Sequence, residues 1–198
     1  MLTFYHAPQS RAFGVLWLLE EMRLEYTLAS IDVRADAPRP AGYRDIQPHG
    51  KVPAIDHDGK LVSERAAICM RLAEAFPGHG LLPPVGDPWR TPCIQMLVYT
   101  DAVVDPCLAA RAAGWSYRAS DFSFGSFQDM VDNLRRILSA RPFAAGHDFT
   151  VADTQLATAL FWAIEVLGIV ANEPVLDDYL GRMRQRPAWA RAESRDAA

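Results

Sequence analysis

The sequence predicts an α/β domain followed by an all-α domain. The first eighty residues alternate short strand-like apolar runs with helical stripes, whereas the rest contains long helical patterns and no convincing strand. Between these parts, residues 76–88 hold four prolines and three glycines, which is typical of an interdomain linker. We therefore expect one domain over residues 1–78, a linker over residues 79–87 and an all-α domain over residues 88–198.

The first domain has the element order strand, helix, strand, hairpin, helix. Leu2–Tyr5 is a short apolar and aromatic run, and apolar positions between Val15 and Met22 follow the helical spacing i, i+3, i+4, i+7. A right-handed crossover in the first β-α-β unit gives a four-stranded mixed sheet with helices packed on it, although this order also suits other small α/β folds. A second strand is expected over Tyr26–Val33, followed by a loop over Arg34–Gly42 that contains Pro38 and Pro40. A hairpin of Val52–Asp56 and Lys60–Val62 comes next. The last element is a helix with apolar residues at Ile68, Leu72, Ala75 and Phe76.

Four long helical patterns make up the second domain. They cover about 89–113, 126–139, 151–167 and 173–185. The run from Thr150 to Asp153 fits the capping box of a helix N-terminus, with Asp in the position where Glu or Gln is usual. We expect Thr150 and Asp153 to be structural, with the cap residue contributing about 1 kcal/mol.

Composition and charge are those of an ordinary globular protein. The 198 residues are 50% hydrophobic and 22% charged, with a net charge of −4 and a pI of about 5.7. Nucleic-acid and membrane partners favour clustered Lys and Arg, whereas here Lys is scarce and Arg is scattered, so we expect neither partner. The first residues lack a signal-peptide pattern, and no stretch approaches the roughly 20 apolar residues of a membrane span. The cytoplasm is the expected compartment.

The three cysteines, Cys69, Cys93 and Cys107, form no CxxC pair. They also have no metal-ligand spacing with the five histidines, so we expect no metal site. Each cysteine is expected to be a small buried hydrophobic residue.

Val52-Pro53 lies where the first hairpin strand begins. Proline cannot donate to a strand ladder, so it belongs at a strand start or a sheet edge, where neighbouring backbone groups stay unpaired. The amide and carbonyl of Val52 are then placed to pair with an extended, peptide-like ligand, as an added strand would. The alternative is an edge proline that only prevents aggregation.

Ser63-Glu64-Arg65 lies where the last helix of the first domain begins. Free backbone N–H groups and the helix dipole favour an anion at such a position, so a ligand carboxylate suits it. The alternative is ordinary capping, with Ser63 as the N-cap and Glu64 in the first turn. Both hold together if Ser63 caps the helix while the N–H groups of Glu64 and Arg65 face a ligand.

A hydroxyl near the start of the first helix is a candidate for stabilising a ligand thiolate. Ser10 follows the first strand, and Tyr5 is the competing hydroxyl just upstream. Lowering a thiol pKa by about two units takes roughly 2.7 kcal/mol. A hydroxyl hydrogen bond to a charged group contributes about 1.5–3 kcal/mol, and a helix N-terminus up to about 1 kcal/mol more. The alternatives are Ser10 as a helix N-cap and Tyr5 as a packed sheet aromatic.

Four segments in this order resemble the cytosolic glutathione transferases of bacterial type. They are Tyr5–Glu21, Pro48–Ala54, Glu64–Ile68 and Phe149–Asp153, with the linker between the third and the fourth. The resemblance covers essentially the whole chain and implies a thioredoxin-like first domain that binds glutathione, with an electrophile cleft against the α-domain. It also implies a detoxifying, cytoplasmic homodimer that uses glutathione as cosubstrate and no metal.

The resemblance gives five residues a role in glutathione binding. Pro53 would follow a cis peptide bond, and the backbone of Val52 would pair with the cysteinyl part of glutathione. Glu64 and Arg65 would hold the γ-glutamyl end, and Lys51 would approach the glycyl carboxylate.

Two departures from the family pattern bear on these roles. The family usually has Ser directly after the Glu, where this chain has Arg65; arginine binds carboxylates bidentately, but the small hydroxyl is absent. The position of the catalytic hydroxyl also varies between classes, and Ala7 stands at a site that some classes use. Ser10 is therefore the assigned hydroxyl, with Tyr5 as the alternative. No cysteine lies between Tyr5 and Arg11, which argues against disulfide exchange through a catalytic Cys.

The predicted reaction is attack of the glutathione thiolate on a small hydrophobic electrophile, by substitution or conjugate addition. Other activities on the same scaffold are those of a glutathione-dependent isomerase, peroxidase or dehalogenase. A non-catalytic module that binds glutathione or a protein partner is the remaining alternative. The residues expected to line the electrophile pocket are Phe13, Tyr99, Val103, Pro106 and Trp115.

Overall fold

The computed structural model describes residues 1–34 and 39–197. Pro38 and part of the predicted loop around it lie outside the described residues. The chain forms two compact units: Met1–His79 with the C-terminal segment from Arg186, and Gly80–Gln185. The C-terminal segment was expected in the all-α domain, whereas the structure places it in the first unit.

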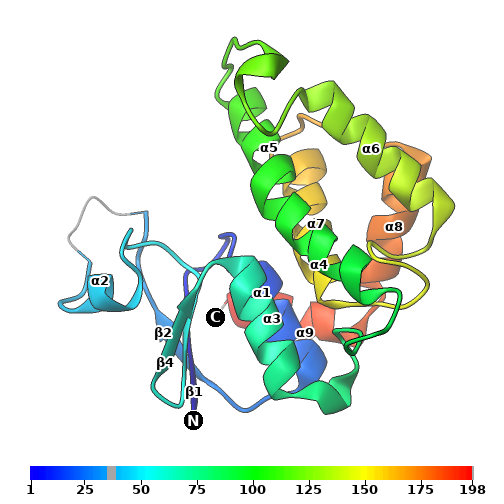
Figure 1. Cartoon of the computed structure of the whole chain (residues 1–198). Coiled ribbons are helices and arrows are strands. Elements are labelled where there is room, and N and C mark those ends of the chain that lie inside the picture. Colours follow the sequence, from blue (N-terminus) through cyan, green and yellow to red (C-terminus); the bar gives the residue numbers. More distant parts are fainter. Residues whose placement is uncertain (35–38, 198) are drawn as a thin grey trace. The chain divides into compact units, whose positions relative to one another are not determined.

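The first unit is built on a four-stranded mixed sheet (Figure 1). Its strands are β1 (Leu2–His6), β2 (Thr27–Ser30), β3 (Ala54–His57) and β4 (Lys60–Ser63). The strand order is β2-β1-β3-β4, with β1 parallel to β2 and β3 antiparallel to both of its neighbours. The predicted mixed sheet is confirmed. Strand β2 is shorter than predicted, because only its four residues pair with β1.

Three long helices accompany the sheet: α1 (Phe13–Met22), α3 (Arg65–Ala75) and α9 (Pro187–Asp196). Helix α1 contacts both α3 and α9, which explains why almost all of its residues are buried. Trp189 of α9 makes edge-to-face contacts with Phe13 and Trp17, at ring-centroid distances of 5.1 and 4.8 Å. Helices α1 and α3 agree with the sequence prediction, whereas α9 was not predicted.

Ion pairs also hold α9 on α1. Glu20, which is 6% exposed, pairs with Arg191 at 3.2 Å and with Arg195 at 2.8 Å. The two carboxylate oxygens of Glu21 accept hydrogen bonds from Nε and Nη2 of Arg186, at 2.6 and 2.9 Å. Bidentate arginine–carboxylate pairing of this kind is both directional and strong. These contacts explain why the C-terminal segment belongs to the first unit.

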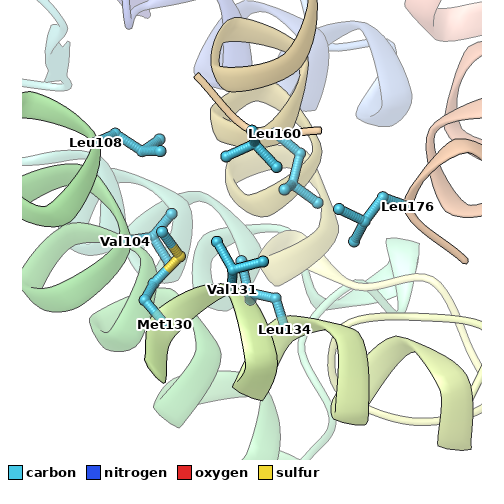
Figure 2. A pocket seen from close by; sticks show the side chains of 8 residues that line it. Val104, Leu108, Met130, Val131, Leu134, Leu160 and Leu176 are labelled. Carbon is cyan, nitrogen blue, oxygen red and sulfur yellow. The ribbon is translucent and has the colours of Figure 1, made fainter. Parts of the chain in front are cut away.

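The second unit is helical, and its described residues contain no strand. Its long α-helices are α4 (Arg90–Tyr99), α5 (Asp105–Ala112), α6 (Phe127–Ala140), α7 (Val151–Phe161) and α8 (Pro174–Arg184). The predicted helical patterns are therefore confirmed. Figure 2 shows apolar side chains of this core turned toward one another, and they leave no space large enough for a water molecule. The side chains are Val104, Leu108, Met130, Val131, Leu134, Leu160, Val170 and Leu176.

A π-helical turn, Thr100–Val104, joins α4 to α5. Within it the amide of Asp105 donates to the carbonyl of Thr100, one residue further back than in an α-helix. Pro106 explains this wider turn, because its ring would clash with the preceding helical turn and it has no N–H to donate.

The continuous helical run Arg90–Ala112 has 23 residues and is long and apolar enough, by these two criteria alone, to cross a membrane. The expectation that no stretch approaches the length of a membrane span does not hold for this run. A core helix of a soluble protein passes the same test. Cys93, Leu97 and Leu108 of this run are buried in the second unit.

The predicted capping box opens α7. Asp153 is fully buried, and its Oδ2 accepts a hydrogen bond from the amide of Thr150 at 2.8 Å. Its Oδ1 accepts from the amide of Ala144 at 2.7 Å and from the hydroxyl of Tyr179 at 3.0 Å. Asp153 therefore ties α7 to the segment after α6 and to α8, which exceeds the capping role predicted for it.

Asp153 should make the stability of the protein depend on pH. Burial raises the pKa of Asp153 to about 6, whereas an unfolded Asp titrates near 3.9. The folded state thus binds this proton more tightly, and the resulting stabilisation is complete below about pH 3.9 and is lost as the pH rises through about 6. We predict that the unfolding free energy of the wild type, minus that of Asp153→Asn, falls as the pH rises from about 4 to about 7. Urea denaturation of both proteins measures this difference, and a difference that rises or stays constant would contradict the prediction.

Candidate functional site

Three segments of the first unit meet at one end of the sheet, where strands β1, β3 and β4 begin or finish. Ala54 of β3 pairs with Tyr5 of β1 on one side and with Ser63 of β4 on the other. The loop after β1, the residues before β3 and the start of α3 therefore lie at the same end of the sheet, where these strands begin or finish. These segments hold the predicted residues Ser10, Val52 and Glu64.

The Val52-Pro53 peptide bond is cis. Val52 is half-buried and precedes the first residue of β3 by two positions. Within the described residues, neither the amide nor the carbonyl of Val52 makes a hydrogen bond. Both groups are thus available to an extended ligand beyond the end of the β1–β3 ladder.

The loop before Val52 is held from two sides. Helix α2 (Tyr43–Ile46), which the sequence analysis did not predict, supplies the Tyr43 hydroxyl that donates to the carbonyl of Lys51 at 2.6 Å. Burial raises the pKa of Tyr43 to about 12, so the hydroxyl stays protonated as a donor. The Oε1 of the buried Gln47 accepts from the amide of Lys51 at 3.0 Å. The backbone of Lys51 is therefore fixed while its side chain is exposed.

Glu64 opens α3 in an unusual backbone conformation. Its φ of 68° and ψ of 123° lie where non-glycine residues are rare, and such residues gather at functional sites. Glu64 is the N-cap of α3, whereas Ser63, the predicted cap, is the last residue of β4. The Glu64 side chain makes no capping hydrogen bond and is exposed at this end of the sheet.

Arg65 is the first residue of α3 and is only 7% exposed. A guanidinium stays charged in proteins, so it adds a fixed positive charge to the partial charge of the helix N-terminus. The family resemblance implies that Arg65 contacts the γ-glutamyl end of glutathione. Its burial favours an electrostatic contribution over direct side-chain contact.

Ser10 lies in the turn before α1, whose N-cap is Ala12. The Ser10 hydroxyl donates to the carbonyl of Ala7 at 2.6 Å and accepts from the amide of Ala12 at 3.2 Å. The capping alternative for Ser10 is therefore wrong in detail, since Ser10 bonds the N-cap amide from two residues upstream. Rotation about the Cβ–Oγ bond is needed before this hydroxyl donates to a ligand sulfur.

Tyr5 is half-buried near the C-terminal end of β1. Its ring packs against Tyr43 at a centroid distance of 5.6 Å, as the packing alternative expected. Within the described part of the chain, its hydroxyl makes no hydrogen bond. Ser10 and Tyr5 therefore differ in that only the Ser10 hydroxyl is already engaged with the backbone.

Several residues that hold the Ser10 loop in place have no counterpart among the predicted site residues. Nη2 of Arg34 donates to the carbonyls of Pro8 and Gln9, at 2.9 and 2.6 Å. The amide of Gln9 donates to Oδ2 of Asp196 at 2.9 Å, and Oδ1 of Asp196 lies 3.0 Å from Nε2 of the buried His6. No sequence signal links these residues, because Asp196 lies 187 positions after Gln9.

The predicted electrophile-pocket residues are divided between the two units. Phe13 is buried in the first unit against Trp189. Tyr99, Val103 and Pro106 are half-buried on the helical run of the second unit, and Trp115 is exposed after α5. Their role in binding an electrophile stays a prediction.

The cysteines behave as predicted, since Cys69, Cys93 and Cys107 are all buried and free. Among the described residues, no group of three or more His, Cys, Asp and Glu side chains is arranged to hold a metal ion.

The family model for the N-terminal domain of glutathione S-transferases matches residues 10–75. This part of the first unit is therefore similar to the N-terminal domain of glutathione S-transferases. The chain is 27% identical over 191 residues to the glutathione S-transferase GstA of Escherichia coli O157:H7, with 94% of each chain covered. Glutathione S-transferases therefore match both the local motifs and the full length of the chain.

Solved structures of glutathione S-transferases share the fold over the same length. The enzyme of Methylococcus capsulatus is 26% identical, with a TM-score of 0.85 over 100% of this chain and 99% of the other. A sphingomonad glutathione S-transferase, solved in complex with glutathione, is also 26% identical, with a TM-score of 0.83 over 98% of each chain. The predicted architecture, a thioredoxin-like domain with a helical C-terminal region, is thereby confirmed.

Proposed function

We propose that this chain is a glutathione transferase that binds glutathione at the end of the sheet and stabilises its thiolate. The observation that carries the proposal is the unpaired backbone of Val52 at the same end of the sheet as the start of α3. Glutathione is an extended tripeptide with a carboxylate at each end, so it suits a strand-like backbone partner beside a helix N-terminus.

Each part of glutathione has a proposed partner. The backbone of Val52 pairs with the cysteinyl part, and the exposed carboxylate of Glu64 binds the ammonium group of the γ-glutamyl part. The N-terminus of α3 and the charge of Arg65 attract the γ-glutamyl carboxylate. The exposed side chain of Lys51 reaches the glycyl carboxylate.

The proposed reaction starts when the bound thiol loses its proton to solvent. The Ser10 hydroxyl, or the Tyr5 hydroxyl in the alternative, donates a hydrogen bond that stabilises the thiolate. The sulfur then forms a bond to an electrophilic carbon. In substitution a halide leaves with the bonding electron pair, and in conjugate addition the carbanion takes a proton from solvent. The protein contributes orientation and electrostatic stabilisation.

Two assays on the full chain test this function. Calorimetric titration with glutathione should show saturable binding, and 1-chloro-2,4-dinitrobenzene with glutathione should be turned over. Binding without turnover of this or any other electrophile would support a binding module instead. Absence of both binding and a thermal shift with glutathione would refute the proposal. A symmetric homodimer in the cytoplasm is also proposed, and sedimentation analysis of the purified chain tests the dimer.

Glu64→Gln should raise the Kd for glutathione about tenfold or more, because it removes the charge of one hydrogen-bonded ion pair. The backbone and side-chain shape of this residue are retained. Glu25→Gln is the matched control, since Glu25 is exposed in the same unit and the change in net charge is equal. The Glu25 variant should bind like the wild type. Equal affinities for all three proteins would remove Glu64 from the site.

A further inference from the structure

A pocket of about 290 Å³ lies between α4 and α6 in the second unit. Its volume is close to the lower limit of small-molecule sites, about 300 Å³. Its lining is Gln95, Met96, Tyr99, Asn133, Arg136, Ile137, Ala140 and Arg141. None of these residues belongs to the first unit, so the pocket is formed without the proposed glutathione site.

Two arginines give this pocket a positive charge. Within the described residues, neither Arg136 nor Arg141 forms an ion pair with a carboxylate. Nη2 of Arg136 donates to Oδ1 of Asn133 at 2.7 Å, and Nη1 of Arg141 donates to the carbonyl of Ala145 at 3.0 Å. Both guanidinium groups thus have donors left over for a ligand.

Arg141 also carries a buried donor that has no partner among the described residues. Its Nε is buried and, within the described residues, has no hydrogen-bond acceptor. Because this atom is shielded from the pocket, a ligand there would meet the remaining Nη donors of the two arginines. Burial lowers the pKa of Arg141, the neighbouring Asp153 opposes this effect, and Arg136 adds to it. An anion between the two guanidinium groups would relieve their repulsion.

The remaining lining defines the shape of the ligand. Met96, Ile137 and Ala140 are apolar, and no acidic residue lines the pocket. Arginine binds both carboxylates and phosphates bidentately, and the apolar part of this lining favours an organic anion over inorganic phosphate. We propose that this pocket binds a small organic carboxylate, with its charged group on Arg136 and Arg141 and an apolar body against the aliphatic side chains.

Calorimetric titration of the full chain with benzoate tests the proposal, with benzamide as the neutral probe of the same shape. We expect saturable benzoate binding, and benzamide should bind at least about tenfold more weakly. Arg136→Gln should raise the Kd for benzoate about tenfold or more. Arg118→Gln is the matched control, because Arg118 is 85% exposed, pairs with Asp121 at 3.1 Å and does not line the pocket. This control should bind benzoate like the wild type.

Several results would overturn the proposal. These are equal binding of benzoate and benzamide, equal Kd values in Arg136→Gln and the wild type, and no saturation by about 10 mM benzoate. A carboxylate of a second copy of this chain is another source of the same group. If Arg136→Gln self-associates more weakly in sedimentation and the wild type does not bind benzoate, the pocket belongs to a contact between two copies of the chain. That result would refute the proposal of a small-molecule ligand. Glu64→Gln should leave benzoate binding unchanged, so that a failure of the glutathione proposal can be told apart from a failure of this one. Reduced benzoate binding in this variant would show that benzoate binds at the proposed glutathione site and not in the pocket.

Discussion

Replacing Asp153 with alanine is expected to lower the free energy of unfolding by about 3–5 kcal/mol. The fully buried carboxylate accepts hydrogen bonds from the amides of Ala144 and Thr150 and from the hydroxyl of Tyr179. Its removal leaves these buried donors without an acceptor, at about 1–3 kcal/mol each. Partial relaxation of the donors keeps the loss toward the lower end of their sum.

Urea denaturation of matched variants measures this effect. Asp178→Ala is the control, because Asp178 is exposed on α8, and it should change stability by less than about 0.5 kcal/mol. Tyr179→Phe removes one donor and leaves no new unpaired group on the tyrosine side, so it should cost only about 1 kcal/mol. A loss below about 1 kcal/mol in Asp153→Ala would show that the donors find other acceptors.

The elements that were predicted correctly are those with a regular local pattern, such as helical spacing or a short turn between two strands. Helix α1 carries apolar residues at helical spacing, and β3 and β4 pair across a two-residue turn, Asp58-Gly59. Helix α9 was missed because its buried residues, Ala188, Trp189 and Ala192, include a single large apolar side chain. Its stability depends on α1, which lies more than 160 positions away, as the 165-residue separation of Arg186 and Glu21 shows. Local periodicity carries no information on such a partner.

The candidate site was predictable where it depends on local sequence, and not where it depends on tertiary packing. Val52 and Glu64 flank strands whose order is readable, so the sequence indicated a shared end of the sheet. The cap of α3 was placed one residue early, because no residue pattern reports the positive φ of Glu64. The burial of Arg65 and the contacts of Asp196 with the Ser10 loop depend on tertiary packing, which a single sequence does not show.

Ser10→Ala is expected to lower kcat for 1-chloro-2,4-dinitrobenzene at neutral pH by about 10- to 100-fold. The reason is the loss of a hydroxyl hydrogen bond to the thiolate, which contributes about 1.5–3 kcal/mol. The effect should shrink near pH 9, since the thiol ionises unaided as the pH passes its ordinary value of about 8.5. A pH profile of kcat therefore separates thiolate stabilisation from simple damage to the loop.

Loop damage is a real competitor, because the Ser10 hydroxyl also bridges Ala7 and Ala12. Loop damage would lower kcat equally at every pH and would also raise the Kd for glutathione. Loss of thiolate stabilisation would instead leave this Kd nearly unchanged at low pH, because the thiol is protonated there. Tyr5→Phe is the decisive comparison, since it removes a hydroxyl with no hydrogen bond in the described structure and keeps the ring on Tyr43. If Tyr5→Phe abolishes turnover while Ser10→Ala keeps it, the thiolate partner is Tyr5, and the backbone contacts of Ser10 are its whole role.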